Sequence, residues 1–449
     1  MVQIYRFAAV RPERQYSQDI PSVPYDVVTA AEARECIEKN PLSFLRVSRP
    51  DAELPDLPPN DDRVYQRARE IFDEMLSDGK FQRDAEPGMY VYRAVQDGEE
   101  FVGLVCCVAT EDYENRTIRR HELTRYDKEE DRTRHIDVVG ANTGLVFLLY
   151  RDPGEIASCV HSITEAAEPD GSTTTASGVL HEIYRVTDDE TLSRLEDLFS
   201  AVPALYIADG HHRAKSAVNV AERRRDSGRF TEEAGKFMVV LFAHDRVRIH
   251  GYSRLVTDLG NYTFPGLVDA LLNAGWDVRP YGKVDASGYQ IPPLAANDAP
   301  MHVMHFYIKG TWYEVSKPVA DPDDLIGSLD VSVLQKEILE GMLGIADPRG
   351  DPRLHYMGGA KPLSSLERLV DSGEYALAIA MQPVRVETVL AIADADGVMP
   401  PKSTWLSRNS SQGWSSTPST NKSGSLFNPL FCPIIADEEA HDRWSKKGS

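Results

Sequence analysis

One stretch of the sequence, Ala204 to Ala221, constrains the fold more than any other. Ala204–Ala208 has the composition of a buried strand, and Asp209-Gly-His-His-Arg213 follows it directly. Apolar residues then recur at helical spacing, which predicts a helix with one buried face: Ala214, Ala217, Val218 and Ala221. Ligands often bind where a strand runs through a polar turn into a helix. We therefore predict an α/β fold with a ligand site at this turn.

The remaining patterns predict a mixed α/β (α+β) chain with two regions. The first region should contain strands over 89–95, 101–109, 146–150, 181–186 and 237–242, helices over 64–76 and 188–199, and a capping box at Thr29-Ala-Ala-Glu32. The second should contain helices over 265–274 and 331–343 and strands over 301–308, 311–315 and 376–381. We assign residues 1–260 to a phosphate- or nucleotide-binding α/β region and residues 261–405 to a second α/β domain.

Composition narrows the classes of partner. The net charge of −21 repels nucleic-acid phosphates, so nucleic acid is a disfavoured partner, whereas a small anion can still be held locally. No apolar run approaches the ~20 residues that a membrane-spanning helix needs, and the first residues do not form a signal peptide. The five scattered cysteines form no C-x-x-C pair, which argues against a zinc or redox motif. We expect a cytoplasmic protein without a membrane partner.

The turn after Ala208 has the chemistry of a phosphate cradle. Gly210 permits a tight turn, and the helix that follows presents unpaired N–H groups and its positive dipole end. His211, His212 and Arg213 add side-chain donors, and the guanidinium of Arg213 can bind two phosphate oxygens. The alternative is a solvated helix start that Asp209 caps.

Three further clusters carry charges that suit an anion or a cation. His121-Glu122 with Lys128 and Arg132 can organise a phosphate or a metal, although a solvated helix face explains the same spacing. Asp26, after Pro24-Tyr25, can serve as a base or a magnesium ligand, or simply as a turn residue. Lys402, in Met399-Pro-Pro-Lys-Ser-Thr-Trp405, can hold an anion. The sequence contains neither a Walker loop nor the H-E-x-x-H motif of zinc proteases.

Several of these segments together resemble, in order, the fingerprint of the DUF1015 family of bacterial and archaeal proteins. The matching segments are Pro24-Tyr-Asp-Val27, Asn40-Pro-Leu-Ser-Phe-Leu45, the His121 to Arg132 cluster, Asp209-Gly-His-His-Arg213, Leu329-Asp-Val331 with Leu334-Gln335, and Met399 to Trp405. They span residues 1–405. The function of the family is poorly established, so this resemblance by itself implies little chemistry.

The Asp209–Arg213 box is also similar to the phosphate-binding box of the ParB/sulfiredoxin superfamily, and within it most similar to kinases that act on free serine. The resemblance implies a ParB/sulfiredoxin-like N-terminal region. It also implies that Gly210, His211, His212 and Arg213 bind nucleotide phosphates, and that Asp209 binds magnesium or the substrate hydroxyl.

The leading hypothesis is a nucleotide-dependent phosphotransferase that acts on a small hydroxyl metabolite, with free serine as the candidate substrate and with ATP or ADP and Mg²⁺ as cofactors. The candidate catalytic residues are Asp209, Glu122 and Asp26, with Asp209 also the candidate metal ligand. The candidate phosphate ligands are Gly210, His211, His212, Arg213, His121, Lys128, Arg132 and Lys402. We expect His121, Glu122, Lys128 and Arg132 to converge on the cleft of His212. The alternative hypothesis is a non-catalytic nucleotide- or phosphometabolite-binding regulator of the partition-protein kind, for which Arg223-Arg-Arg225 offers a small basic patch.

The tail over residues 406–449 differs from the rest of the chain. Ser407 to Ser425 is rich in Ser, Asn, Thr and Gly and predicts disorder. The DUF1015 family usually continues past Pro-Pro-Lys-Ser-Thr-Trp with a segment like Phe-Glu-Pro-Lys-Leu, where this chain has Leu406-Ser-Arg-Asn-Ser410. Written as TTG AGC CGA AAC TCG, these codons yield Phe-Glu-Pro-Lys-Leu when one pyrimidine is inserted after the first TT. We therefore hypothesise a one-base frameshift, in the gene or its read, at Leu406; the alternative is a genuinely divergent tail.

Overall fold

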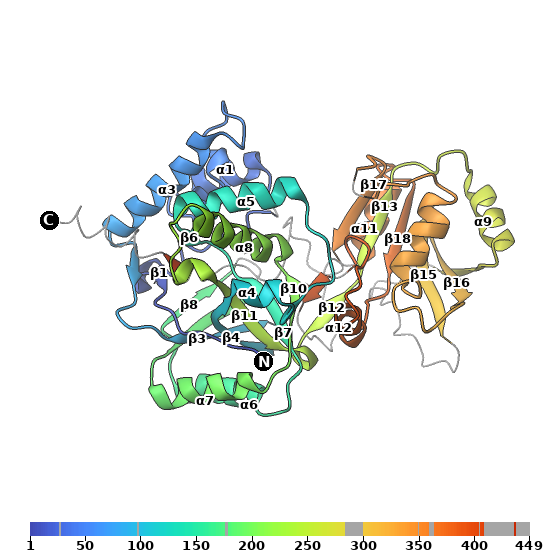
Figure 1. Cartoon of the computed structure of the whole chain (residues 1–449). Coiled ribbons are helices and arrows are strands. Elements are labelled where there is room, and N and C mark those ends of the chain that lie inside the picture. The colour runs from blue at the N-terminus through green and yellow to red at the C-terminus, as the bar shows by residue number, and fades with distance from the viewer. Residues whose placement is uncertain are drawn as a thin grey trace. The chain divides into compact units, whose positions relative to one another are not determined.

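The computed structural model divides into two units, and the boundary lies between Val247 and Arg248 (Figure 1). Unit 1 comprises Met1–Val247, and unit 2 comprises Arg248–Ser407. The structure describes residues 1–26, 28–96, 98–175, 178–282, 300–348, 350–358, 363–403, 405–407 and 435–436. Most of the predicted tail therefore lies outside the described residues. Both units mix helices and strands, which confirms the predicted α/β class.

The sequence patterns put the boundary after residue 260, whereas the contacts put it before Arg248. The difference arises from β13 (Tyr252–Val256), which pairs with β17 (Leu354–Gly358) and β18 (Leu377–Met381) and so belongs to the sheet of unit 2. A short strand of this kind carries no local sign of which sheet it will join, because its partners lie about a hundred residues away.

Unit 1 is built on an eight-stranded sheet. Its spatial order is β5 (Ile118–Arg119), β10 (Leu205–Asp209), β7 (Val146–Tyr150), β11 (Lys236–Ala243), β4 (Glu99–Ala109), β3 (Met89–Gln96), β9 (Leu180–Val186) and β8 (Gly171–Thr174). All five residues of β7 are buried, as the continuous apolar run predicts for a strand covered on both faces. The predicted hairpin is confirmed, since β3 and β4 pair antiparallel from Tyr90↔Val105 to Gln96↔Glu99.

Strand direction brings two chain segments together at one end of this sheet. β10 runs antiparallel to β7, and Asp209 at the end of β10 lies opposite Phe147 near the start of β7. The residues that precede β7 and those that follow β10 therefore meet at the same edge. This edge carries the candidate site.

Helices lie on both sides of the sheet (Figure 1). On one side, α8 (His211–Asp226) packs against α5 (Tyr126–Val139), which in turn contacts α3 (Asp62–Ser77). The other side carries α6 (Ile156–Ala166) and α7 (Asp189–Ser200). The predicted capping box is confirmed at α1 (Ala30–Lys39), where the Thr29 hydroxyl accepts from the Glu32 amide at 3.2 Å and the Glu32 carboxylate accepts from the Thr29 amide at 2.9 Å.

Unit 2 contains a six-stranded sheet in the order β14 (Asp277–Gly282), β16 (Thr311–Pro318), β15 (Met301–Ile308), β18, β13 and β17. Its helices include α9 (Phe264–Asn273), α11 (Leu363–Asp371) and α12 (Val386–Asp394). The helix expected over 331–343 differs from the prediction, since α10 (Asp330–Val333) passes into a π-helix over Leu334–Glu340. Its apolar positions suit both helix types, so periodicity alone does not separate them. A small ladder joins β12 (Arg248–His250) to β19 (Trp405–Ser407).

Candidate functional site

The turn between β10 and α8 leaves the start of a long helix open. Gly210 has φ +90°, a left-handed conformation that a side chain would strain, and it forms the N-cap without a capping side chain. Helical hydrogen bonding begins where the Ala214 amide donates to the Gly210 carbonyl at 2.9 Å. The amides of the first three helical residues therefore lack partners inside the helix. Asp209 is not the cap, in contrast to the alternative that the sequence left open.

Arg213 lies across this turn in a fixed position. Its Nη2 donates to Asp209 Oδ2 at 2.7 Å, and its Nη1 donates to the carbonyl of Leu145. A Cβ on Gly144 or on Gly210 would come within 3.3 Å of the Arg213 side chain, so two glycines make room for it. Burial lowers the pKa of Arg213, but the carboxylates of Asp209 and Asp26 raise that pKa more, and the net shift is upward. The guanidinium is therefore charged and pre-oriented.

Three of the predicted site residues line one pocket of unit 1. Asp26 comes from the loop before α1, Arg132 from the middle of α5 and Arg213 from the first turn of α8. The other lining residues come from the same loop, from the region of α2 (Leu45–Ser48), from α5, and from the edge around β7 and β11: Val23, Pro24, Tyr25, Phe44, Ser48, His135, Ile136, Asn142, Thr143, Gly144, Val146 and Met238. Two arginines and a carboxylate thus share a pocket beside the open start of α8.

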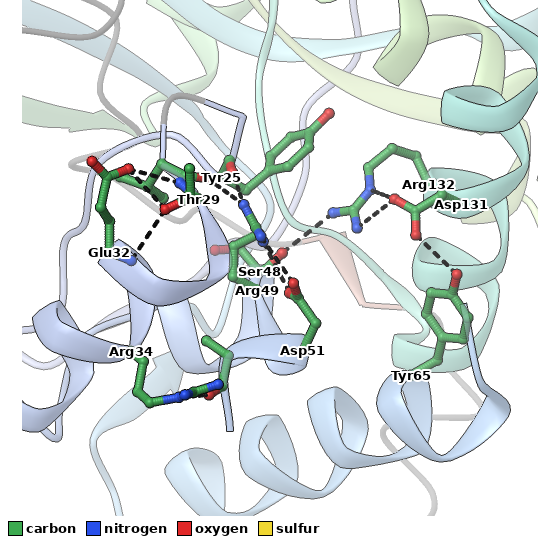
Figure 2. Close-up of polar contacts among 12 residues, drawn as sticks. Tyr25, Thr29, Glu32, Arg34, Ser48, Arg49, Asp51, Tyr65, Asp131 and Arg132 are labelled. Atoms are coloured by element: carbon green, nitrogen blue, oxygen red, sulfur yellow. Dashed lines mark hydrogen bonds and ion pairs between the residues drawn. The ribbon is translucent and has the colours of Figure 1, made fainter. Parts of the chain in front are cut away.

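Arg132 is held between a carboxylate and an aromatic ring (Figure 2). Its Nε donates to Asp131 Oδ2 at 2.8 Å, and its Cζ lies 4.3 Å from the centroid of the Tyr25 ring. Asp131 also accepts from the Tyr65 hydroxyl at 2.9 Å. Burial raises the pKa of Asp131, but Arg132 and Tyr65 lower that pKa more, so it lies below its usual value. Arg132 is thereby fixed as a cation at the pocket wall.

Arg49 supports the loop that carries Asp26, and the sequence analysis missed it (Figure 2). Its Nη1 donates to the carbonyl of Tyr25 at 2.9 Å and to that of Val28, while its Nε and Nη2 donate to Asp51 at 2.9 and 2.8 Å. The contacts with the two carbonyls reach across more than twenty residues of sequence, so neither periodicity nor spacing marks Arg49. Asp26 raises the pKa of Arg49 and that of Arg213, and it lines the same pocket as Arg213.

The histidines differ from the phosphate donors that the sequence predicted. His121 and His211 are buried in edge-to-face contact, with their ring centroids 4.8 Å apart. Burial lowers the pKa of His121 to about 4 and that of His211 well below its ordinary value. Both ring nitrogens of His121 and Nε2 of His211 have no hydrogen-bond partner in the described part of the chain. In this conformation both rings are neutral, and they bring no positive charge to a phosphate.

His212 connects the starts of two helices. Its Nε2 accepts from the amide of Arg125, the N-cap residue of α5, at 3.0 Å. Burial lowers the pKa of His212, while Glu129, Asp127 and Asp26 oppose this shift. His212 therefore holds the start of α5 beside the start of α8.

The predicted residues come together only in part. Arg132 lies in the pocket of Asp26 and Arg213, but His121, Glu122, Lys128 and His212 are absent from the lining that the structure describes. Glu122 is half-buried just before α5, and Lys128 is exposed in its first turn. Lys402 belongs to unit 2. Their roles as ligands stay predictions.

Metal binding has limited support from the side chains alone. Among the described residues, no group of three or more His, Cys, Asp or Glu side chains is arranged to hold a metal ion. Asp209 keeps one carboxylate oxygen outside its ion pair with Arg213, and its side chain is 47% exposed. Magnesium usually binds one or two carboxylates together with substrate phosphates, so this arrangement is compatible with a magnesium–nucleotide complex.

Among the described residues, no helix is long and apolar enough to cross a membrane.

The chain belongs to the family described as "Protein of unknown function (DUF1015)", whose model matches residues 4–332. No curated protein matches it.

Solved structures are similar only at a distance. A free serine kinase in complex with AMP is 13% identical with a TM-score of 0.34, and the match covers 68% of this chain and 87% of that one. A conserved hypothetical protein from Pyrococcus furiosus is 13% identical with a TM-score of 0.31, covering 68% and 90%. SbnI with a C-terminal truncation, from Staphylococcus aureus, is 10% identical with a TM-score of 0.32, covering 76% and 94%. Scores this low carry no argument about the site, and the ParB/sulfiredoxin resemblance stays a prediction.

Proposed function

We propose that this member of the DUF1015 family binds the phosphates of ATP or ADP at the start of α8 and transfers a phosphoryl group to the hydroxyl of a small metabolite, with free serine as the candidate substrate. One observation carries the proposal: Arg213, at the open start of α8, lines the same pocket as Asp26 and Arg132. Phosphoryl transfer depends on positioned phosphates and a nearby base, and this pocket offers groups for both.

The phosphate-binding part of the proposal rests on the first turn of α8. Three amides without helical partners and the positive end of a 16-residue helix favour an anion there. Gly210 has no side chain, so a phosphate can approach the backbone. Arg213 keeps donors beyond those that bind Asp209 and Leu145, because a guanidinium carries five N–H groups.

Asp26 is the residue that we assign as base. Its carboxylate is exposed, and it makes no hydrogen bond or ion pair with the described part of the chain. In the proposed step it accepts the proton of the substrate hydroxyl while the hydroxyl oxygen bonds to the γ-phosphorus. The bond from that phosphorus to the β–γ bridging oxygen breaks, and ADP leaves with the electron pair. Asp209 would hold Mg²⁺, which would neutralise phosphate charge.

Asp26→Asn tests the assignment, with Asp226→Asn as the matched control. Asp226 is an exposed aspartate at the far end of α8. ADP release from ATP and Mg²⁺ would be measured with and without serine, and nucleotide affinity by calorimetry. We expect serine-dependent ADP release that falls by about 10²–10⁴-fold in Asp26→Asn, the usual contribution of a general base, with little change in ATP affinity. Unchanged transfer in Asp26→Asn would remove Asp26 as the base. ATP binding without turnover on any hydroxyl substrate would instead favour a binding regulator.

A further inference from the structure

Arg254 in unit 2 is a buried cation that has no acidic partner among the described residues. Arg254 lies on β13, between β17 and β18, and only 3% of it is exposed. Its Nη1 donates to the carbonyl of Tyr252 and its Nη2 to the carbonyl of Lys402 at 3.3 Å. Its Cζ lies 5.3 Å from the centroid of the Tyr356 ring. No carboxylate among the described residues forms an ion pair with it. A buried charge without a counter-charge is costly, and proteins usually pair it.

The other buried arginines among the described residues follow that rule, since Arg69, Arg132 and Arg224 each form an ion pair with an aspartate. Arg353, also in unit 2, donates from Nη2 to Asp351 at 2.8 Å although it is more exposed than Arg254. Arg49 pairs with Asp51 in the same way in unit 1. Burial lowers the pKa of Arg254 to about 10, and only the neighbouring tyrosines Tyr356 and Tyr252 oppose this shift. Arg254 is thus a fixed guanidinium to which the described residues supply dipoles and aromatic rings but no ion-paired carboxylate.

A second cation lies next to it. Lys402 is exposed, and its backbone has φ +58°, a conformation that is uncommon outside glycine. Its Nζ lies 5.2 Å from the centroid of the Tyr252 ring, and the residue makes no ion pair with the described residues. Tyr252 and Arg254 are two positions apart on one strand and so project to the same face of the sheet. The carbonyl of Lys402 also accepts from Arg254, which ties the two residues together.

We propose that Arg254 and Lys402 form an oxyanion-binding site in unit 2, which takes the phosphate or carboxylate group of a small metabolite. The two side chains have complementary chemistry. A guanidinium presents a rigid set of donors with fixed direction, whereas an ammonium is a mobile point charge on a flexible stem. A bound oxyanion supplies the counter-charge that the neighbourhood of Arg254 lacks.

Lys402→Gln tests the site without disturbing a buried residue, and Lys309→Gln is its matched control. Lys309 is an exposed lysine in the same unit, and it too has a positive φ, of 47°. Hydrogen exchange of the full chain would be followed by mass spectrometry in peptides that cover Tyr252 and Lys402. Inorganic phosphate or acetate would be titrated at constant ionic strength, with chloride as the balancing anion. Peptides from the start of α8 report separately on the proposed nucleotide site.

We expect at least one of the two anions to slow exchange around Tyr252 and Lys402 in the wild type and in Lys309→Gln. In Lys402→Gln the half-saturating concentration should rise about tenfold, equivalent to about 1.4 kcal/mol. Protection by either anion supports the site, and the anion that binds more tightly identifies the ligand class. Absence of protection by both anions, or equal responses in the two glutamine variants, would overturn it. Because the α8 peptides are read in the same experiment, failure here is distinguishable from failure of the nucleotide site.

Discussion

Acid should destabilise unit 1 through its buried histidine pair, and His121 allows the size of the effect to be worked out. The pKa of this residue is about 4 in the folded protein and about 6.5 in an unfolded chain. The folded-state pKa is the lower one, so the stability that the neutral ring contributes is fully present above about pH 6.5. It is lost progressively as the pH falls towards about 4, because the unfolded chain binds the proton more readily. From about pH 6.5 down to pH 5, an interval of about 1.5 pH units, the free energy of unfolding falls by about 1.4 kcal/mol per pH unit. The loss of stability at pH 5 is therefore about 2 kcal/mol.

His121→Phe isolates this contribution, because phenylalanine keeps a ring of similar shape that does not titrate. The free energy of unfolding would be measured by urea titration with circular dichroism at pH 7 and at pH 5. Between these pH values the wild type should lose about 2 kcal/mol more than His121→Phe. His355→Phe is the control, since His355 is exposed in unit 2 and makes no ion pair with the described residues, and the loss in this variant should match that of the wild type. Equal losses in the wild type and in His121→Phe would refute the claim that His121 is buried and neutral.

Three more outcomes are expected. Arg213→Lys should weaken ATP binding by about 1.5–3 kcal/mol in calorimetry, because lysine lacks the oriented donors of a guanidinium. The control Arg223→Lys, at the surface end of α8, should bind ATP as tightly as the wild type. Equal ATP affinities of the two variants would remove Arg213 from the site. Gly210→Ala should lower the free energy of unfolding by about 1–3 kcal/mol, since its φ of +90° strains any side chain; wild-type stability in a urea titration would contradict this conformation. If the frameshift lies in the read, resequencing the gene should show one additional base at the Leu406 codon; an unchanged reading frame there, together with a well-packed tail in an experimental structure, would refute the frameshift.

Features defined by neighbouring residues could be predicted from the sequence. The capping box at Thr29 and Glu32 is a local exchange of two hydrogen bonds, and the structure contains both. The hairpin of β3 and β4 follows from two alternating runs on either side of a short turn. The strand–turn–helix at Asp209 to Arg213 is equally local, because Gly210 and the apolar stripe that follows it determine its geometry.

Features that depend on tertiary contacts could not be predicted in this way. Arg49 orients the loop of Asp26 through carbonyls far along the chain, and nothing in its own segment indicates them. The contact of His121 with His211 depends on how β5 and β10 pair, so no local pattern indicates that both rings are buried and neutral. Asp209 resembles a helix cap in sequence, but Arg213 one turn later takes its carboxylate. For Arg49, His121 and Asp209 alike, a residue that tertiary folding brings into contact determines the side chain's protonation state or its structural role.

We propose above that the open start of α8 binds nucleotide phosphates. A crystal structure of the full chain with ADP and Mg²⁺ tests it most directly. We expect phosphate oxygens within hydrogen-bond distance of the amides of His211, His212 and Arg213, with the guanidinium of Arg213 in contact with one of them. Nucleotide bound elsewhere in the molecule, with the first turn of α8 free of phosphate, would contradict it.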